Sequence, residues 1–231
     1  MKILAIDTSA FPASAAVTDG EYILGEYVIR NQRKHSQNIM PMVDSLLDGL
    51  GMDISEIDVF AVTVGPGSFT GLRIGISTVR AFAQAMDKPV VGISTLEVLA
   101  YNFAGACVTV VPMLDARRDE VFTAAYNGGE TILKPCVMTV GEAAELFADS
   151  GAIYTGDGAV KHREEILAAD PTAVIAAPNL CEVRASAAAA AAYKKAENGE
   201  GVNYNEIQPV YLRKSQAERE YDNKMKGNEN K

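Results

Sequence analysis

The sequence predicts an α/β protein of two lobes, each built from three consecutive strands and the helices that follow them. Two observations carry this prediction. Short apolar, β-branched runs give way to helical spacing early in the chain, and the same order of patterns restarts after Gly105. Three strands followed by helix, strand, helix and strand make a mixed sheet whose faces the crossover helices must cover. We therefore expect lobes at 1–104 and 105–213, with a flexible charged tail over 214–231.

In the first lobe, periodicity of two or of 3.6 residues separates the strands from the helices. Asp19-Gly20 marks a hairpin between the second and third strands, Gly51 ends the first helix, and Ser94 with Glu97 has the form of a capping box. The expected strands are 2–6, 13–18, 22–29, 58–64 and 89–93, and the expected helices are 36–50, 70–86 and 94–103.

The second lobe repeats the opening of the first. A capping pattern at Thr139 and Glu142 begins a short helix, and the alanine run 187–192 predicts a helix because alanine loses least on entering one. The expected strands are 108–114, 121–126, 131–138 and 152–155, the longer helices are 159–168 and 180–197, and the chain returns to extended structure at 208–212.

Composition restricts the possible functions. The 231 residues are 48% hydrophobic and carry a formal net charge of −9. Nucleic-acid binding draws largely on Lys and Arg at phosphates, so any RNA is expected to be held by another subunit. The three cysteines form no C-x-x-C pair, which favours reduced thiols and a cytoplasmic location. No segment approaches the ~18 uninterrupted apolar residues of a membrane span, so we expect no contact with the bilayer.

The turn Gly65-Pro66-Gly67 joins the fourth strand to the second helix, which Ser68 or Thr70 can cap. Such a turn can cradle an anion on free N–H groups at the helix N-terminus, or it can simply let a strand pass closely into a helix. A P-loop is rejected, because Gly71-Leu72-Arg73 stands where Gly-Lys-Ser/Thr is required. A dinucleotide-binding fingerprint is incomplete as well, because Thr70 stands where its third glycine is expected.

Asp7, Thr8 and Ser9 are the candidate cofactor-binding residues. A carboxylate and two hydroxyls at the end of a first strand can hold a metal-bound phosphate in a cleft between lobes. The alternative is a turn whose side chains bond their own backbone. Asp115 occupies the matching position in the second lobe. The two histidines, His35 and His162, form no metal-binding pair, so no metal site and no catalytic residue is expected.

The two long helices of the first lobe carry apolar residues in more than one direction. Ile74 and Phe82, for example, lie off the main stripe of the second helix. The surplus can form a helix-on-helix contact with another chain, or it can belong to a deeper core of this one. The candidate partner residues are Ile39, Met40, Val43, Leu46, Leu47, Leu72, Ile76, Val79 and Ala83. A charge at Val43, Leu46, Ile76 or Val79 is expected to abolish partner binding without unfolding the chain.

Four segments resemble the TsaB (YeaZ) family: 3–9, His35-Ser36, the string Gly65-Pro66-Gly67-Ser68-Phe69-Thr70-Gly71-Leu72-Arg73-Ile74-Gly75, and 92–96. Looser similarity continues through 115–117 and 120–122 to 209–213. The resemblance implies the actin-like, sugar-kinase and Hsp70-like fold (ASKHA, ribonuclease H-like), with two lobes of mixed sheets flanked by helices.

The same resemblance implies a non-catalytic scaffold for forming threonylcarbamoyladenosine at position 37 of tRNA. It implies pairing with the catalytic subunit TsaD through the first-lobe helices, with the ATPase TsaE joining. When the chain is alone, the same helices can dock a second copy to form a homodimer, but the sequence does not reveal whether isolated chains dimerise. No cofactor is expected to bind tightly to this chain. ATP and Mg²⁺ are used by the partner subunits, and tRNA is reached only through the complex.

The catalytic relative of this family uses a His-x-x-x-His motif and a glycine-rich adenosine site. Here His35 is followed by Ser36-Gln37-Asn38-Ile39, and Gly156-Asp157-Gly158 is only a remnant of a nucleotide loop. Two alternatives remain open. One is an ATP-dependent small-molecule kinase of the same fold, and the other is a glycoprotease-like peptidase, for which no pair of nucleophile and base is found.

Overall fold

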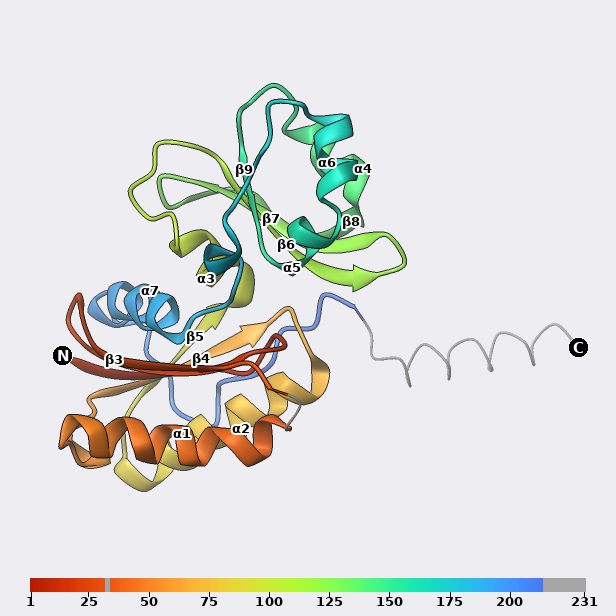
Figure 1. The fold of residues 1–231 in the computed structure, drawn as a ribbon. Helices are drawn as coiled ribbons and strands as arrows, with labels where there is room; N and C mark the ends of the chain where they lie inside the picture. The colour runs from red at the N-terminus through yellow and green to blue at the C-terminus, as the bar shows by residue number, and fades with distance from the viewer. Residues whose placement is uncertain (32–33, 214–231) are drawn as a thin grey trace, which may run out of the picture.

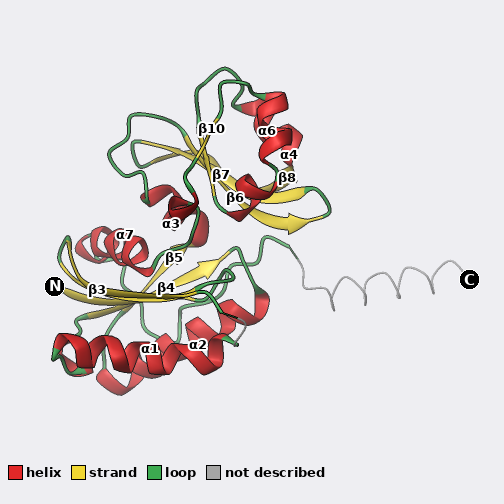
Figure 2. Cartoon of the chain, viewed as in Figure 1, coloured by secondary structure: helices red, strands yellow, loops and turns green. Residues whose placement is uncertain are grey.

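The computed structural model describes residues 1–31 and 34–213, which form two lobes that each contain a five-stranded mixed sheet (Figure 1). The tail predicted at 214–231 lies outside the described residues. Helices cover the sheets on their faces (Figure 2). The predicted two-lobed α/β class is confirmed.

The first sheet has the order β3-β2-β1-β4-β5. β1 pairs with β2, and β2 with β3, in antiparallel fashion, whereas β1 pairs with β4, and β4 with β5, in parallel. The strands are β1 (Lys2–Asp7), β2 (Ala13–Asp19), β3 (Tyr22–Ile29), β4 (Val59–Gly65) and β5 (Val90–Ser94). Parallel pairs need crossover helices, which are α1 (His35–Leu50) between β3 and β4 and α2 (Phe69–Met86) between β4 and β5.

The second sheet repeats this arrangement, since its order β8-β7-β6-β9-β10 has the same sequence of antiparallel and parallel pairs. Its strands are β6 (Val110–Arg117), β7 (Glu120–Asn127), β8 (Glu130–Thr139), β9 (Ile153–Thr155) and β10 (Val174–Ile175), and its helices are α4 (Val140–Leu146), α5 (Asp157–Lys161) and α6 (Arg163–Ala169). Both halves of the chain therefore use one topology, with β1 and β6 in equivalent central positions.

The two faces of the first sheet have different cores. α1 and α2 lie side by side on one face, where a cluster that includes Phe60, Val62 and Ile76 is closed to water. α7 (Ala185–Glu197) covers the other face, and α3 (Thr95–Tyr101) lies between the lobes. The second core contains the alanines of α7, residues of α3, and Leu114 and Ala124 of the second sheet. A continuous apolar core therefore joins the lobes on this side.

The lobe boundaries differ from the prediction at the C-terminal end. The predicted second lobe, 105–213, is too long, because α7 packs on the first sheet and the chain after it contacts that lobe at Val202 and Val210. Val202 bridges Val90 of β5, and Val210 N donates to Val64 O at 2.7 Å. The alanine run makes this possible, since small side chains let a helix approach a sheet closely.

Most predicted elements are confirmed, and the exceptions have local causes. The helix predicted at 159–168 is broken at His162 into α5 and α6, and the helix predicted from 180 begins at Ala185. The segment 208–212 is not a strand, and the short β10 is unpredicted. The capping box at Ser94 is wrong, because the Ser94 side chain does not cap α3 and Glu97 pairs with Lys195 of α7 at 2.8 Å.

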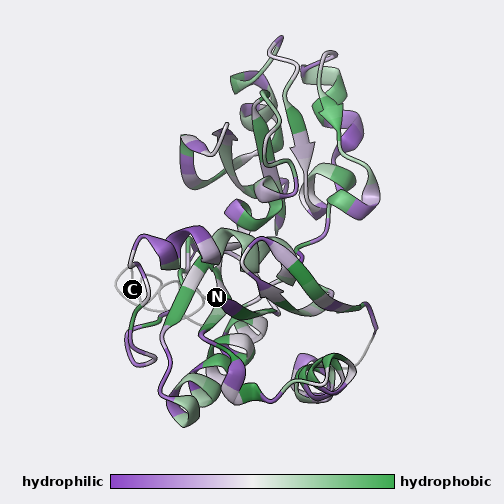
Figure 3. Ribbon diagram, turned by 90° about the vertical axis from the view of Figure 1, so that its left-hand side faces the viewer, coloured by the Kyte–Doolittle hydropathy of each residue, from purple (hydrophilic) through white to green (hydrophobic). Residues whose placement is uncertain are grey.

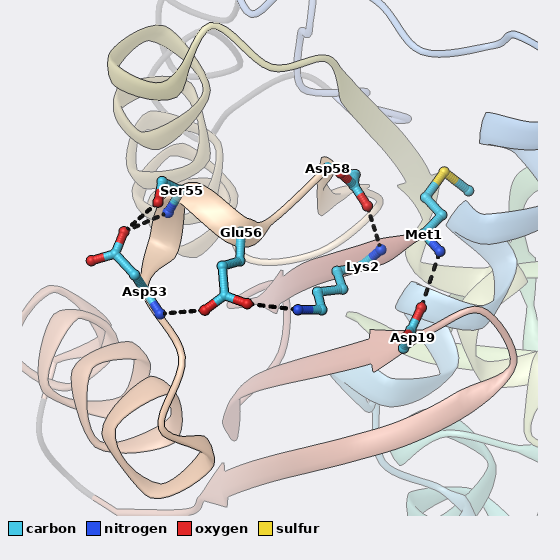
Figure 4. A network of polar contacts seen from close by, with 7 residues as sticks. All are labelled: Met1, Lys2, Asp19, Asp53, Ser55, Glu56 and Asp58. Carbon is cyan, nitrogen blue, oxygen red and sulfur yellow. Dashed lines mark hydrogen bonds and ion pairs between the residues drawn. The ribbon is translucent and has the colours of Figure 1, made fainter.

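A polar network fixes the start of β1 against the loop before β4 (Figure 4). Lys2 Nζ lies 2.7 Å from Glu56 Oε2, and Lys2 N donates to Asp58 Oδ2 at 2.8 Å. Asp53 and Glu56 form a capping box around the short 3₁₀ helix η1 (Ile54–Glu56). The pair with Lys2 lowers the pKa of Glu56. These contacts link the start of β1 to the loop that leads into β4.

In the described part of the chain, no helix is both long enough and apolar enough to cross a bilayer. α1, seen end-on in Figure 3, carries hydrophobic and hydrophilic residues around its circumference, as expected of a helix with one face on a sheet and one outward.

Candidate functional site

The turn between β4 and α2 lies directly against the end of β1. A Cβ on Gly67 would come within 2.4 Å of Ser9 O, and one on Gly71 within 2.0 Å of Thr8 O. Ser68 N donates to Ser9 O at 2.8 Å, and Ser68 Oγ accepts from Gly71 N at 3.2 Å, which confirms Ser68 as the cap of α2. The glycines therefore serve close backbone packing, the second of the two uses considered above.

The candidate residues Asp7, Thr8 and Ser9 are buried and bonded to one another and to this turn. Asp7 Oδ1 accepts from Ser9 N at 3.1 Å, Ser9 Oγ at 2.6 Å and Thr63 Oγ1 at 2.5 Å. Thr8 Oγ1 donates to Gly71 O at 2.7 Å. Their geometry is that of a turn that bonds itself, because each hydroxyl already has a protein acceptor.

Burial raises the pKa of Asp7, against the lowering effect of the hydrogen bonds from Ser9 and Thr63. Its second oxygen, Oδ2, is buried and has no hydrogen-bond partner within the described residues. No group of three or more His, Cys, Asp or Glu in residues 1–31 and 34–213 is placed to hold a metal ion. Through Oδ1, Asp7 connects Ser9 of the turn to Thr63 of β4.

The second lobe carries the equivalent turn. Asp115 Oδ1 accepts from Arg117 N at 2.9 Å, and Asp115 Oδ2 lies 2.9 Å from Lys161 Nζ. Gly156 has a φ of 98°, and a Cβ there would come within 2.2 Å of Met113 O. Gly156-Asp157-Gly158 is thus a close-packing turn like its first-lobe counterpart.

The two histidine rings contact different parts of the chain. His35 Nε2 lies 3.0 Å from Ala10 O, and His162 Nδ1 lies 3.3 Å from Glu165. Within the described residues neither ring has a Ser, Thr or Cys side chain as its hydrogen-bond partner. The triad geometry of a nucleophile activated by a histidine is not formed in this part of the chain.

Nine residues of α1 and α2 are predicted above to contact a partner, and for eight of them the structure gives another role. Met40 is 43% exposed. The others are buried, and all except Leu72 belong to the core beneath the helices: Ile39, Val43, Leu46, Leu47, Leu72, Ile76, Val79 and Ala83. This corrects them to core residues, because the regular apolar stripe of each helix faces its own sheet. That α1 and α2 carry a partner surface stays a prediction.

The outward side of the two helices forms a groove of about 560 Å³. Its lining comes from the first half of each helix: Ser36, Ile39, Met40, Phe69, Thr70, Arg73, Ile74, Ser77 and Thr78. Phe69 is 39% exposed although it is a large apolar residue. Methionine and phenylalanine are enriched at protein–protein interfaces, and here Met40 and Phe69 are both exposed and line one groove.

Three residues at the rim of the groove form a stack. Arg73 Cζ lies 4.0 Å from the centre of the Phe69 ring, and this ring lies 4.9 Å from that of Tyr211. Arg73 Nε donates to Tyr211 Oη at 3.1 Å. Sequence reasoning missed these residues as site residues. The spacing of Phe69 and Arg73, four apart on the polar side of α2, was the available signal, but nothing in the pattern indicated Tyr211.

Known proteins resemble this chain in both sequence and structure. The chain matches the family model of TsaD, tRNA N6-adenosine threonylcarbamoyltransferase, over residues 23–221. It is 31% identical to the tRNA threonylcarbamoyladenosine biosynthesis protein TsaB of Escherichia coli, over 94% of this chain and 96% of that protein. It is 36% identical to TsaB of Bacillus subtilis over 59% of this chain, and the match spans 60% of that relative.

Among solved structures, YeaZ from Pseudomonas aeruginosa superposes with a TM-score of 0.79 and 31% identity, over 91% of this chain and 99% of that one. The ROK hexokinase from Thermus thermophilus has a TM-score of 0.53 at 13% identity, over 86% of this chain and 100% of that one. The second likeness shows the fold alone, and it confirms the actin-like and sugar-kinase class. The chain belongs to the TsaB (YeaZ) family.

Proposed function

We propose that this chain is a non-catalytic scaffold in the formation of threonylcarbamoyladenosine at position 37 of tRNA, and that it binds TsaD through α1 and α2. Membership of the TsaB family supports the pathway, since relatives bear the name of a tRNA threonylcarbamoyladenosine biosynthesis protein. The observation that carries the proposal is the outward groove of α1 and α2, with Met40 and Phe69 exposed beside it.

The local chemistry supports a scaffold in place of a catalyst. The residue four positions after His35 is not a second histidine. The side chains of Asp7, Thr8 and Ser9 form hydrogen bonds within the turn. The glycines of that turn lie against Thr8 and Ser9. ATP and Mg²⁺ are therefore assigned to the partner subunits.

The partner is expected to offer a matching pair of helices. The chain itself matches the family model of TsaD, so partner and chain share one ancestral fold. Two such chains can pair α1 and α2 about a pseudo-twofold axis, and a second copy can occupy the same face when TsaD is absent. TsaE joins the pair, tRNA is reached through the complex, and the assembly works in the cytoplasm.

The experiment is a binding measurement with purified TsaD from the same organism. Met40→Glu places a charge in the groove, and Val160→Glu, at a 49% exposed residue of the second lobe, is the matched control. Both side chains lie at the surface, so neither variant is expected to lose more than ~0.5 kcal/mol of stability. Met40→Glu should weaken TsaD binding about tenfold or more.

Val160→Glu should bind TsaD like the wild type. Equal binding by the wild type and Met40→Glu would exclude the α1/α2 surface. Calorimetry with Mg-ATP addresses the kinase alternative, since one-to-one micromolar binding by the isolated chain would favour a kinase over a scaffold.

A further inference from the structure

Arg73 carries a positive charge that the fold leaves without a counter-ion. It is exposed, and among the described residues it forms no ion pair, whereas Arg30, Arg184 and Arg213 each pair with a glutamate. In residues 1–31 and 34–213 its anchors are the Phe69 ring and the Tyr211 hydroxyl. A chain of net charge −9 thus keeps one unneutralised cation at its apolar groove.

The anchoring also fixes the direction of the guanidinium group. The guanidinium lies over the Phe69 ring, and the bond from Nε to Tyr211 leaves both Nη groups without a protein acceptor in the described part of the chain. An arginine held by these two contacts has lost part of its side-chain freedom before any partner arrives, so a bond to a second chain costs less entropy.

The position in α2 adds a further argument. Arg73 lies near the N-terminal end of this helix, where the helix dipole gives no stabilisation to a positive charge. Within the fold, the charge is stabilised by its contact with the Phe69 ring and not by the helix dipole. A pre-ordered arginine at the edge of an apolar groove, beside an exposed aromatic residue, has the features of an interface hot spot.

We propose that Arg73 is the charged anchor of the partner interface and that the partner places the carboxylate of an Asp or Glu side chain against its two Nη groups. This rests on the proposed function, which supplies TsaD as the chain that covers the groove. The planar fork of a guanidinium fits a carboxylate through two parallel hydrogen bonds, which a lysine cannot reproduce. Phe69 and Tyr211 are positioning residues for this contact.

The test compares Arg73→Gln, Arg73→Lys and Arg73→Glu in TsaD binding over a range of salt concentrations. Arg118→Gln is the matched control, because Arg118 is an exposed arginine in the second lobe. Arg73→Gln should weaken binding about 30-fold or more, because it leaves the buried carboxylate of the partner unpaired. Arg73→Lys should fall between Gln and the wild type, and Arg118→Gln should bind normally.

A charge-exchange experiment tests the contact between Arg73 and the carboxylate most directly. Each Asp and Glu in the paired helices of TsaD is changed singly to Arg, and one of these changes should restore binding to Arg73→Glu. Melting temperatures of all variants are measured, so that a lost fold is not mistaken for a lost contact. The Met40→Glu variant is measured alongside.

The outcomes separate the two proposals. Loss of binding in Met40→Glu with normal binding in Arg73→Gln would overturn the role of Arg73 and keep the α1/α2 interface. Normal binding in both would overturn the interface itself. Weaker binding in Arg73→Gln without rescue by any TsaD change, and without altered salt dependence, would make Arg73 a mere support for Tyr211 and would also overturn the carboxylate contact.

Discussion

At the scale of single residues, glycine and a buried carboxylate explain why the chain keeps a motif that looks like a phosphate loop. Gly67 and Gly71 are required because a side chain at either position would overlap the backbone of Ser9 or Thr8. Asp7 gathers the hydrogen bonds that close the same turn. The motif packs the turn closely against the end of β1, and it thereby positions the start of α2.

The buried Asp7 predicts a specific dependence of stability on pH. Its folded pKa is raised from the ordinary value of 3.8, so the stability that it contributes is full below that value and is lost as pH rises through the folded pKa. Asp7→Asn keeps an acceptor for Ser9 and Thr63 but cannot ionise. The unfolding free energy of Asp7→Asn relative to the wild type should therefore increase from pH 4 to pH 7.

Urea unfolding at both pH values measures this difference, with Asp44→Asn as a control at an exposed aspartate of α1. A pH-independent difference between Asp7→Asn and the wild type would show that Asp7 does not hold a raised pKa in the folded chain.

In the hairpin between β6 and β7, one substitution is expected to stabilise the protein. Arg118 has a φ of 58°, a left-handed conformation that costs an arginine ~1–2 kcal/mol and costs glycine almost nothing. Arg118→Gly should raise the unfolding free energy by about 0.5–1 kcal/mol after the entropy of glycine is counted. Arg118→Ala retains the conformational cost, so its midpoint of thermal unfolding should not rise, and an equal rise in both variants would refute the explanation.

At the scale of elements, the sequence predicted where α1 and α2 lie but not which of their residues face outward. Spacing located both helices to within a residue or two, and it gave the order of strands and helices along the first lobe. The apolar stripes, however, are wide, and periodicity alone does not tell which edge is covered. Tyr211 reaches the groove from more than 130 positions away, a contact that only the tertiary fold reveals.

The correction of the core residues leads to a prediction about unfolding. Val79 is fully buried beneath α2, so Val79→Glu places a charge in an apolar core and should cost ~3 kcal/mol or more. Far-UV circular dichroism should show a lower melting temperature, and any loss of TsaD binding would follow from it. Gln84→Glu, at an exposed position of the same helix, is the control. An unchanged melting temperature for Val79→Glu would contradict the assignment to the core.

At the scale of the whole molecule, the chain is a duplicated sheet whose last segment returns to the first lobe and then reaches the second. Val202 bridges β5, Val210 bonds to β4, and Arg213 donates to Ala116 O of β6 at 2.8 Å. The order of the predicted strands indicated the duplication. It did not indicate that α7 packs on the first lobe, because an alanine-rich helix has no strong preference for either lobe until both sheets exist.

This architecture agrees with the proposed scaffold role. The equivalent turns of both lobes are closed by their own side chains, and the outward face of α1 and α2 carries exposed Met40 and Phe69 and an Arg73 that forms no ion pair within the described residues. We propose this face of the first lobe as the partner surface.

The measurement that tests the central claim most directly is the rate of threonylcarbamoyladenosine formation on tRNA by purified TsaD and TsaE, with and without this chain. We predict no appreciable product from TsaD and TsaE alone, restoration by the wild-type chain, and no restoration by Met40→Glu. Equal rates with and without this chain, or product formed by this chain alone, would contradict its role as a required, non-catalytic scaffold.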